Sequence, residues 1–394
     1  MRANDILATG RRILGLAMIL VGILCTVAEF AKGSAPHAYF GKAYAAQTQA
    51  GIEVPRVENA KIETRAVAGS LDATMRGIAA QAEKPEWIGY GVDQIAGEHN
   101  TCCDNFRGDG SCGTCRLERD HNENAGTTIV PPAGTLKLEG ARQLVVLFRL
   151  EAKQVARIRI ASEDCTLDAG GLPFVWLTGV KPAESVALLA TYVHDSNFED
   201  RGNHERSLGQ GALTAIALHA DPSADRAFES FVKPDQREGL RKQAAFWMGA
   251  AREKAGLLTL QNMAKSDPSS DVRSHVTFAL SVSHEPGALE EMIRMAHDDT
   301  SSHVRGQALF WLAQKAGQKA VGTIAGAIEN DPDTDVKRKA VFALSQLPKD
   351  EGVPKLIEVA RTNRNPEVRK QAMFWLGQSN DPRALQFFEH VLAK

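Results

Sequence analysis

A repeat of 32 residues dominates the C-terminal half of this chain. A valine or leucine followed by arginine or lysine occurs five times, and a phenylalanine stands six residues after it in each copy. These phenylalanines are Phe246, Phe278, Phe310, Phe342 and Phe374. The copies follow one another without an insertion. A fixed period of about 20–50 residues is typical of stacked-repeat folds, so we expect a solenoid here.

Residues 267–298 show what one copy contains. Asp267-Pro268 predicts a turn, and the apolar residues of 272–280 then follow at helical spacing. The stretch 284–287 contains Pro and Gly and breaks that helix, and 289–296 supply a second apolar stripe. Two helices of about ten residues cannot bury their stripes alone, so the copies must stack.

The position after each phenylalanine alternates between large and small side chains. Tryptophans occupy it as Trp247, Trp311 and Trp375, and alanines as Ala279 and Ala343. Such a row of rings could stack a ligand, but aromatic residues beside Phe and Leu more often pack. We therefore assign the phenylalanines and tryptophans to the seams between repeats.

The turn and first helix of the copies resemble the HEAT-like repeat family. The resemblance lies in 331–344 and 365–372, which both place a proline turn before a Val-Lys or Val-Arg pair. It extends over about 207–394, with five clear copies and a degenerate first copy that begins at Leu208. It implies an all-α solenoid used for protein–protein binding. Some members are lyases or hydroxylases, so the fold alone does not fix the activity.

The resemblance also implies a polar ladder between repeats. In the family, the acidic turn residues pair with the arginine after the valine. By position, Asp267, Asp299 and Asp331 would pair with Arg273, Arg305 and Lys337 of their own or neighbouring copies. The copy at Arg241 departs, with Gln236 and Gly239 in place of the acids.

Residues 61–195 predict a second unit, a β-rich α+β domain. The run 143–151 is apolar and suits a buried strand, and 154–162 alternates as a strand does. Ser70 is placed to cap a helix over 71–82. The expected fold is therefore multidomain, with this β-rich α+β domain before an all-α HEAT-like solenoid.

The N-terminus has the pattern of an export segment. Arg2, Arg11 and Arg12 precede an uncharged, mostly apolar run over 13–28. We interpret 1–31 as a signal peptide or an uncleaved membrane anchor, since this run is shorter than a comfortable bilayer span. Residues 32–60 then predict a linker. The protein is accordingly expected to be exported, to the periplasm or the cell exterior.

Charge limits the kind of partner. The formal net charge of the 394 residues is −2, and Lys and Arg are matched by Asp and Glu. This balance argues against nucleic acid as a partner. We expect a protein partner, and contact with a membrane only through the N-terminal segment if it is not cleaved.

The loop 98–124 concentrates cysteines within the first domain. Cys102, Cys103, Cys112 and Cys115, flanked by His99 and His121, would suit a four-ligand metal site, with zinc as the ion. An exported loop rich in cysteine is more often held by disulfides. We therefore favour disulfides, with the metal site as the alternative.

Cys165 makes the disulfide pairing ambiguous. Cys102 and Cys103 could pair with Cys112 and Cys115, or Cys165 could tie the loop to the domain. An odd number leaves at least one thiol unpaired or intermolecular. Cys112 and Cys115 also form a C-x-x-C pair, although no thioredoxin-like helix follows it.

Two further patterns are weaker. The pairs His204-Glu205 and His284-Glu285 resemble iron ligands of helical-repeat hydroxylases, but their spacing is not a multiple of 32, so we interpret them as surface turns. Asp104, Asp109 and Asp120 do not match a calcium loop. We predict no catalytic or cofactor-binding residue.

The expected function is that of an exported HEAT-repeat scaffold that binds a protein through its solenoid. The alternative is a metal-binding or redox protein with its site in the cysteine loop, over 99–121, and the solenoid as a docking arm.

Overall fold

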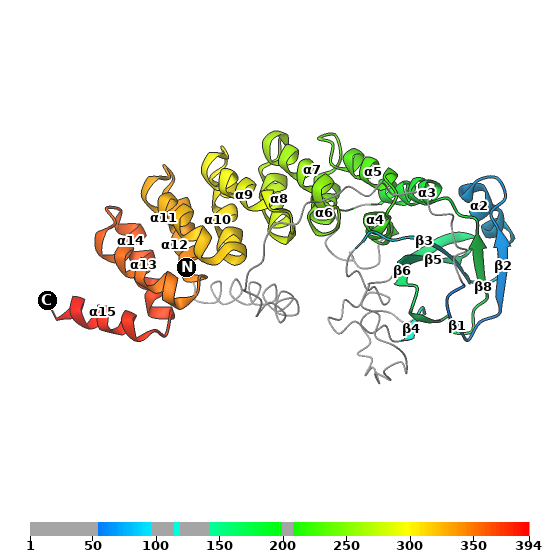
Figure 1. Cartoon of the computed structure of the whole chain (residues 1–394), viewed down its shortest axis with the longest axis horizontal. Helices are drawn as coiled ribbons and strands as arrows, with labels where there is room; N and C mark the ends of the chain where they lie inside the picture. Colours follow the sequence, from blue (N-terminus) through cyan, green and yellow to red (C-terminus); the bar gives the residue numbers. More distant parts are fainter. Residues whose placement is uncertain (1–53, 97–113, 119–141, 197, 199–207, 394) are drawn as a thin grey trace, which may run out of the picture.

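A computed structural model describes residues 54–96, 114–118, 142–196, 198 and 208–393. Within them, an N-terminal unit of two sheets and three helices continues into a curved double row of helices (Figure 1). This arrangement confirms the expected fold class, a sheet-containing region followed by an α-solenoid.

The larger sheet has five strands in the order β2-β8-β3-β5-β6. Strands β2 and β3 run parallel to β8, which lies between them, whereas β3, β5 and β6 are antiparallel neighbours. The strands are β2 (Ile62–Ala66), β3 (Glu86–Asp93), β5 (Gln143–Glu151), β6 (Gln154–Ser162) and β8 (Phe174–Thr178).

Strand β5 is apolar along most of its length because both faces of the sheet are covered. Val146 and Phe148 point into the main core, and the alternating Val145 and Leu147 point into a smaller core on the opposite face. Side chains alternate between the two faces of a strand, so a strand with two covered faces needs apolar residues at successive positions.

The smaller core lies under a parallel three-stranded sheet of β1 (Val57–Glu58), β7 (Thr166–Asp168) and β4 (Thr114–Arg116). Val57 pairs with Leu167, so the ordered sheet already includes residue 57. Residues 57–58, which the predicted linker over 32–60 includes, therefore belong to this sheet, because they gain backbone partners from β7.

Helices cover the other face of the large sheet. Helix α2 (Leu71–Gln81) begins where predicted, with Ser70 accepting a hydrogen bond from the Ala73 backbone N–H. Helix α3 (Pro182–Asp195) and helix α4 (Leu208–Leu218) pack together, and α4 also packs on β6. Helix α4 thus belongs to the sheet's core as well as to the first, degenerate repeat.

The solenoid consists of helices in two rows. The first row continues from α4 with α6 (Glu238–Ala251), α8 (Ser270–Val282), α10 (Ser302–Ala316), α12 (Thr334–Ser345) and α14 (Pro366–Gln378). The second has α5 (Ser223–Phe231), α7 (Glu253–Ser266), α9 (Gly287–Asp298), η2 (Gly317–Ala320) with α11 (Val321–Asn330), α13 (Lys349–Thr362) and α15 (Pro382–Leu392).

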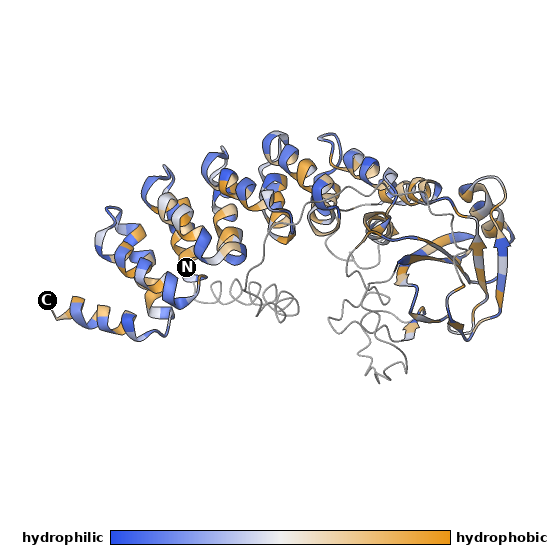
Figure 2. Cartoon of the chain, in the orientation of Figure 1, coloured by the Kyte–Doolittle hydropathy of each residue, from blue (hydrophilic) through white to orange (hydrophobic). Residues whose placement is uncertain are grey.

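The helices of both rows turn their hydrophobic residues toward one another and their polar residues outward (Figure 2). The predicted core positions Val272, Val276 and Leu280 are fully buried in α8, as are Met292 and Met295 in α9. One hydrophobic cluster extends from the large sheet through α4 into every repeat. Among the described helices, none is long and apolar enough to cross a membrane.

Candidate functional site

The first row of helices lines the inner side of the solenoid's curve (Figure 1). Its consecutive members, α6, α8, α10, α12 and α14, pack closely on one another, whereas consecutive helices of the second row touch much less. In a curved double layer, the more closely spaced row lies on the inside. The first row therefore forms the concave surface, which solenoid proteins commonly use for binding.

A continuous ladder of aromatic rings runs across this inner row. Neighbouring rings lie with centroids 4.8–5.8 Å apart, a spacing typical of favourable aromatic pairs. Phe246 stacks on Phe278 at 15°, and Phe310 stacks on Phe342 at 4°. In spatial order the rings are Trp247, Phe246, Phe278, Trp311, Phe310, Phe342, Trp375 and Phe374.

At every second seam, a tryptophan contacts the phenylalanine of the preceding repeat. Trp311 reaches back to Phe278, and Trp375 reaches back to Phe342, at centroid distances of 4.8 and 4.9 Å. These two contacts and the two phenylalanine stacks join successive copies, so the assignment to the seams is confirmed for the rings that make them. At the two ends of the ladder, Trp247 and Phe374 contact the neighbouring ring of their own copy. The alternation of Trp with Ala is also explained, since one indole occupies each second seam.

The ladder is not a buried core, however. Its phenylalanines and tryptophans are all partly exposed, and Phe374 is 54 % exposed. On α10 they share a solvent-facing stripe with His303, Gln307 and Gln314, which follow helical spacing. A contiguous, partly exposed aromatic row marks a surface suited to binding, which the sequence pattern alone had assigned to packing.

Buried ion pairs form a second ladder along the solenoid. Each arginine reaches forward to the aspartate that begins the next repeat, 26 residues later: Arg241 to Asp267, Arg273 to Asp299 and Arg305 to Asp331, at 2.7–2.9 Å. Arg273 also donates to the backbone carbonyl of Asp267, so one guanidinium ties two turns together. Arg241 also joins this ladder, and the expected departure of its copy is wrong at the first acidic position, because Asp235 stands 32 residues before Asp267.

The predicted pairing of Lys337 is wrong. Its ammonium donates to the backbone carbonyl of Glu329, 2.7 Å away, rather than to an aspartate carboxylate. The residue 26 positions later is Asn363, so no anion stands where the ladder would continue. Asn363 instead donates to the carboxylate of Glu329.

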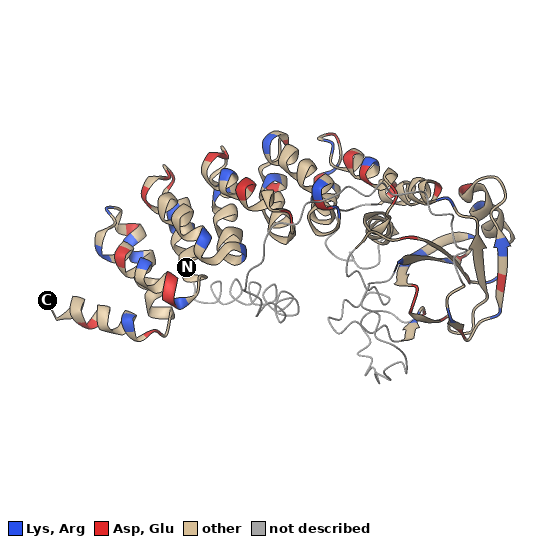
Figure 3. Cartoon of the chain, in the orientation of Figure 1, with Lys and Arg blue, Asp and Glu red and all other residues tan. Residues whose placement is uncertain are grey.

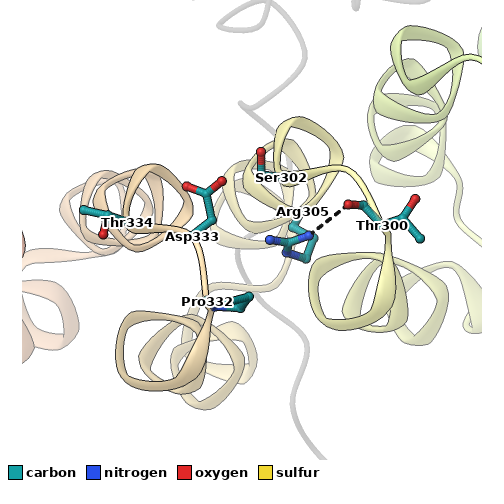
Figure 4. A pocket seen from close by; sticks show the side chains of 6 residues that line it. All are labelled: Thr300, Ser302, Arg305, Pro332, Asp333 and Thr334. Carbon is teal, nitrogen blue, oxygen red and sulfur yellow. Dashed lines mark hydrogen bonds between the residues drawn. The ribbon is translucent and has the colours of Figure 1, made fainter.

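An open depression of about 600 Å³ lies between two of these turns (Figure 4). Arg305 lines it, but its guanidinium already donates to Asp331, Asp299 and Thr300. Asp333 caps α12 through the backbone N–H of Asp335. Both charged groups therefore already form hydrogen bonds within the protein. We do not assign a ligand to this depression, because neither group needs one.

A buried polar chain joins the sheet to the solenoid. Ser185 Oγ lies 2.7 Å from Tyr90 Oη and 2.9 Å from His219 Nε2, and His219 Nδ1 lies 2.7 Å from the Ala215 carbonyl oxygen. A carbonyl only accepts, so Nδ1 carries the proton and Nε2 accepts from Ser185. Tyr90 then donates to Ser185.

This serine–histidine pair is structural. Tyr90, Ser185 and His219 are each 0 % exposed, so no substrate reaches the hydroxyl. Burial lowers the pKa of His219 to about 4, and the imidazole stays neutral as the hydrogen bonds require. No motif marks His219 in the sequence, which is why sequence reasoning missed this junction.

Arg252 completes the junction. Its guanidinium donates to the backbone carbonyls of Ala217 and His219 at the end of α4, and to the carboxylate of Asp225. These carbonyls have no partner within their own helix. The arginine at the start of α7 therefore fixes the helix that the sheet and the solenoid share.

Of the predicted cysteine site, the structure describes Cys115 and Cys165. Cys115 lies in β4 and Cys165 just before β7, and both are buried in the small core between the two sheets. Burial, reinforced by Asp164, raises the pKa of the Cys165 thiol to about 12, which makes it a poor nucleophile.

The remaining candidates, His99, Cys102, Cys103, Cys112 and His121, lie outside the described residues, as do His204-Glu205 and the three aspartates of the loop. In the part that is described, no group of three or more His, Cys, Asp or Glu is placed to hold a metal ion. Disulfides and a metal site in this loop both stay predictions.

Glu118 attaches the end of this cysteine segment to the large sheet. Its carboxylate accepts three hydrogen bonds from Arg149, at 2.9–3.1 Å, and one from the indole N–H of Trp87 at 2.7 Å. Such a forked pair fixes geometry as well as charge. Cys115 is thereby held at a fixed place on the domain.

Comparison with known proteins identifies the repeats. A family model for HEAT repeats matches residues 225–313 and 323–394. Residues 225–394 are HEAT repeats. They account for the double row of helices, the 32-residue period and the forward-reaching Arg–Asp ladder. No curated protein sequence matches the chain, and the N-terminal unit belongs to no family recognised by these comparisons.

Several solved structures match part of this chain. Human deoxyhypusine hydroxylase is 16 % identical over 53 % of this chain and 90 % of its own, with a TM-score of 0.27. Escherichia coli YibA is 22 % identical over 53 % of this chain and 80 % of its own, with a TM-score of 0.33. A chain of the CpcE–CpcF complex of phycocyanin lyase from Nostoc is 18 % identical over 53 % of this chain and 80 % of its own, with a TM-score of 0.29. At these values the likenesses carry no conclusion about activity.

Proposed function

We propose that this protein is an exported HEAT-repeat scaffold that binds a protein partner through the concave row of its solenoid. The observation that carries the proposal is the aromatic ladder, because rings that are partly exposed on adjoining repeats offer a long hydrophobic surface. Aromatic side chains supply much of the binding energy at protein interfaces. The basic and apolar N-terminal segment supports export, to the periplasm or the cell exterior.

The charge distribution supports a protein partner rather than nucleic acid. Acidic and basic residues are interspersed along the solenoid, and no long basic face appears in the view of Figure 3. Nonspecific nucleic-acid binding requires a strongly basic stripe.

The buried Tyr90–Ser185–His219 chain supports a rigid mounting of the solenoid on the N-terminal unit, so that both move together when a partner binds.

Site-specific photo-crosslinking in the full-length chain tests the proposal. A photoreactive residue replaces Gln314 on the concave helix α10 or, as the matched control, Gln318 in η2. We expect a discrete crosslinked protein at position 314 in the envelope fraction, and little at 318. Equal crosslinking at the two positions, or none at 314 while the protein is folded, would contradict the proposal.

A further inference from the structure

The concave surface repeats every two copies rather than every one. Helices α6, α10 and α14 each carry a glutamine three residues before the phenylalanine and four before the tryptophan: Gln243, Gln307 and Gln371. The intervening helices α8 and α12 have His275 and Lys339 at this place. Residues three and four apart are neighbours on a helix, so each glutamine adjoins its own aromatic pair.

The three glutamine amides are unused by the fold. All three side chains are partly exposed, and within the described part of the chain none takes part in a hydrogen bond. By contrast, the amide of Asn363 donates to the carboxylate of Glu329. An amide supplies one acceptor and two donors, a combination that matches the C=O and N–H of a peptide backbone.

A row of positive charge accompanies the amides. Lys242, Arg338, Lys339 and Lys370 stand one helical turn before the phenylalanines, and no acidic residue occupies this row. Lys242 pairs with Glu238, and Arg338 pairs with Asp335, each about one turn earlier in the same helix. Lys339 and Lys370 make no ion pair among the described residues, so their charge is available to a ligand.

The position of Lys339 depends on a glycine across the seam. A Cβ on Gly306 would lie 2.3 Å from Lys339 Cδ and 3.2 Å from its Nζ. The absence of a side chain at Gly306 therefore lets the lysine stem lie over α10. This brings the ammonium onto the neighbouring repeat, toward the turn that carries Gln307.

We propose that the concave row binds an extended, acidic polypeptide segment. In this complex Gln243, Gln307 and Gln371 pair with the backbone of the segment, its apolar side chains lie on the aromatic ladder, and its carboxylates face Lys339 and Lys370. This inference rests on the proposed function and adds the chemistry of the partner. Packed helices lie about 8–10 Å apart, so the three glutamines span about 32–40 Å, or roughly 10–12 extended residues.

Fluorescence anisotropy with the full-length protein tests the inference. The probe is a fluorescein-labelled peptide of about 18 residues, long enough to span the row, in which glutamate alternates with leucine, phenylalanine and serine. A second peptide has lysine in place of each glutamate, and a third has alternate backbone nitrogens methylated. We expect the glutamate peptide to bind at least about tenfold more tightly than either of the others, with an affinity that falls as salt increases.

Protein variants assign the contacts. Replacing the three glutamines by alanine (Gln243→Ala, Gln307→Ala, Gln371→Ala) should weaken binding of the glutamate peptide at least about tenfold. The pair Lys339→Gln and Lys370→Gln should weaken it and reduce its salt dependence. The matched control, Gln318→Ala with Gln386→Ala and Lys319→Gln on the second row, should bind as the wild type does.

Several outcomes would overturn the inference. They are equal binding of the glutamate and lysine peptides, no loss on backbone methylation, unchanged affinity of the glutamine variant, or no binding of any peptide. Equal competition by a sulfated polysaccharide against the wild type and the glutamine variant would show charge attraction alone, and would also overturn it. If the Gln314 crosslink persists in any of these cases, the proposed function stands and only the assigned partner chemistry fails.

Discussion

Arg273 reaches across a repeat seam to Asp299, with two hydrogen bonds of 2.9 and 3.0 Å between guanidinium and carboxylate. The side chains are only 12 % and 4 % exposed. The same arginine donates to the backbone carbonyl of Asp267, and Asp299 accepts from the backbone N–H of Ser301. One ion pair therefore fixes the turn of its own repeat and the turn of the next.

Removal of Asp299 should destabilise the solenoid strongly. Asp299→Ala leaves Arg273 buried without its anion, and breaking a buried pair in this way costs about 3–5 kcal/mol. We expect a loss of about 3 kcal/mol in the free energy of unfolding, measured by urea titration of tryptophan fluorescence. The preceding residue provides the control, because Asp298 is 53 % exposed and Asp298→Ala should cost less than about 0.5 kcal/mol. Similar losses in both variants would show that the ladder is not stabilising.

A fourth rung can be built where the ladder stops. Lys337→Arg with Asn363→Asp restores the arginine and aspartate found at the three earlier seams. Asn363→Asp alone should destabilise, since it places a carboxylate beside Glu329, to which the Asn363 amide now donates. A double-mutant cycle in urea should give a favourable interaction energy of about 1–3 kcal/mol. Strict additivity of the two changes would refute this expectation.

Two glycines should respond in opposite directions to alanine. A Cβ at Gly249 of α6 would lie 2.1 Å from the carbonyl oxygen of Ala279, so α6 and α8 would have to separate. Gly249→Ala should cost about 1–3 kcal/mol. At Gly322 of α11 a Cβ meets nothing within 4 Å, and Gly322→Ala should stabilise by about 0.5–1 kcal/mol. Thermal unfolding of the two variants checks both signs.

Acid should weaken the fold through His219, which is buried, and His275, which is partly buried. Burial lowers the pKa of His219 and of His275 to about 4, with Lys242 adding to the effect at His275. An unfolded histidine has a pKa near about 6.5, so below that pH the unfolded chain binds protons that the folded chain does not. The stability is complete above about pH 6.5 and decreases as pH falls toward about 4, by up to about 3 kcal/mol for each group.

The histidines can be tested separately. His219→Gln removes one titrating group, so the slope of unfolding free energy against pH between about 6.5 and 4.5 should fall by about one proton. His275→Gln should have the same effect on the slope, although it leaves the junction of sheet and solenoid intact. Urea midpoints measured every half pH unit give the slopes. If the slope of both variants equals that of the wild type, neither imidazole is the acid-sensitive group.

Thiol counting with metal analysis tests the cysteine loop. If disulfides hold the loop, as we predict, the native protein should contain no stoichiometric metal and fewer than two reactive thiols. Cys165 is 1 % exposed and its thiol has a raised pKa, so it should react with iodoacetamide only after unfolding. Bound zinc or iron together with four free thiols would support the metal site instead.

The local features of this fold could be read from the sequence because they depend on neighbours along the chain. The helix cap at Ser70, the buried strand over 143–151 and the core positions of α8 follow from residue spacing alone. Residues at 32-residue intervals must also occupy equivalent places in a stack. That condition was enough to locate the seams and the aromatic row, and the family resemblance added most of the Arg–Asp ladder.

Contacts between distant segments could not be read in this way. Nothing near Val57 in the sequence indicates that it pairs with Leu167, and nothing near His219 indicates that Ser185 and Tyr90 enclose it. Likewise, the sequence showed that the ladder rings meet across seams but not that they remain partly exposed. Exposure depends on the curvature of the whole stack, which no single repeat encodes.

The sequence by itself thus determined the repeat, its period and the separation into a β-rich unit and a solenoid. Only the tertiary structure decided that these units share one hydrophobic core through α4, and that the aromatic ladder lies on the concave side. The physical reason is the range of the interactions. Periodic burial is recorded in local spacing, whereas the joint at α4 and the curve of the solenoid arise from packing between residues far apart in the chain.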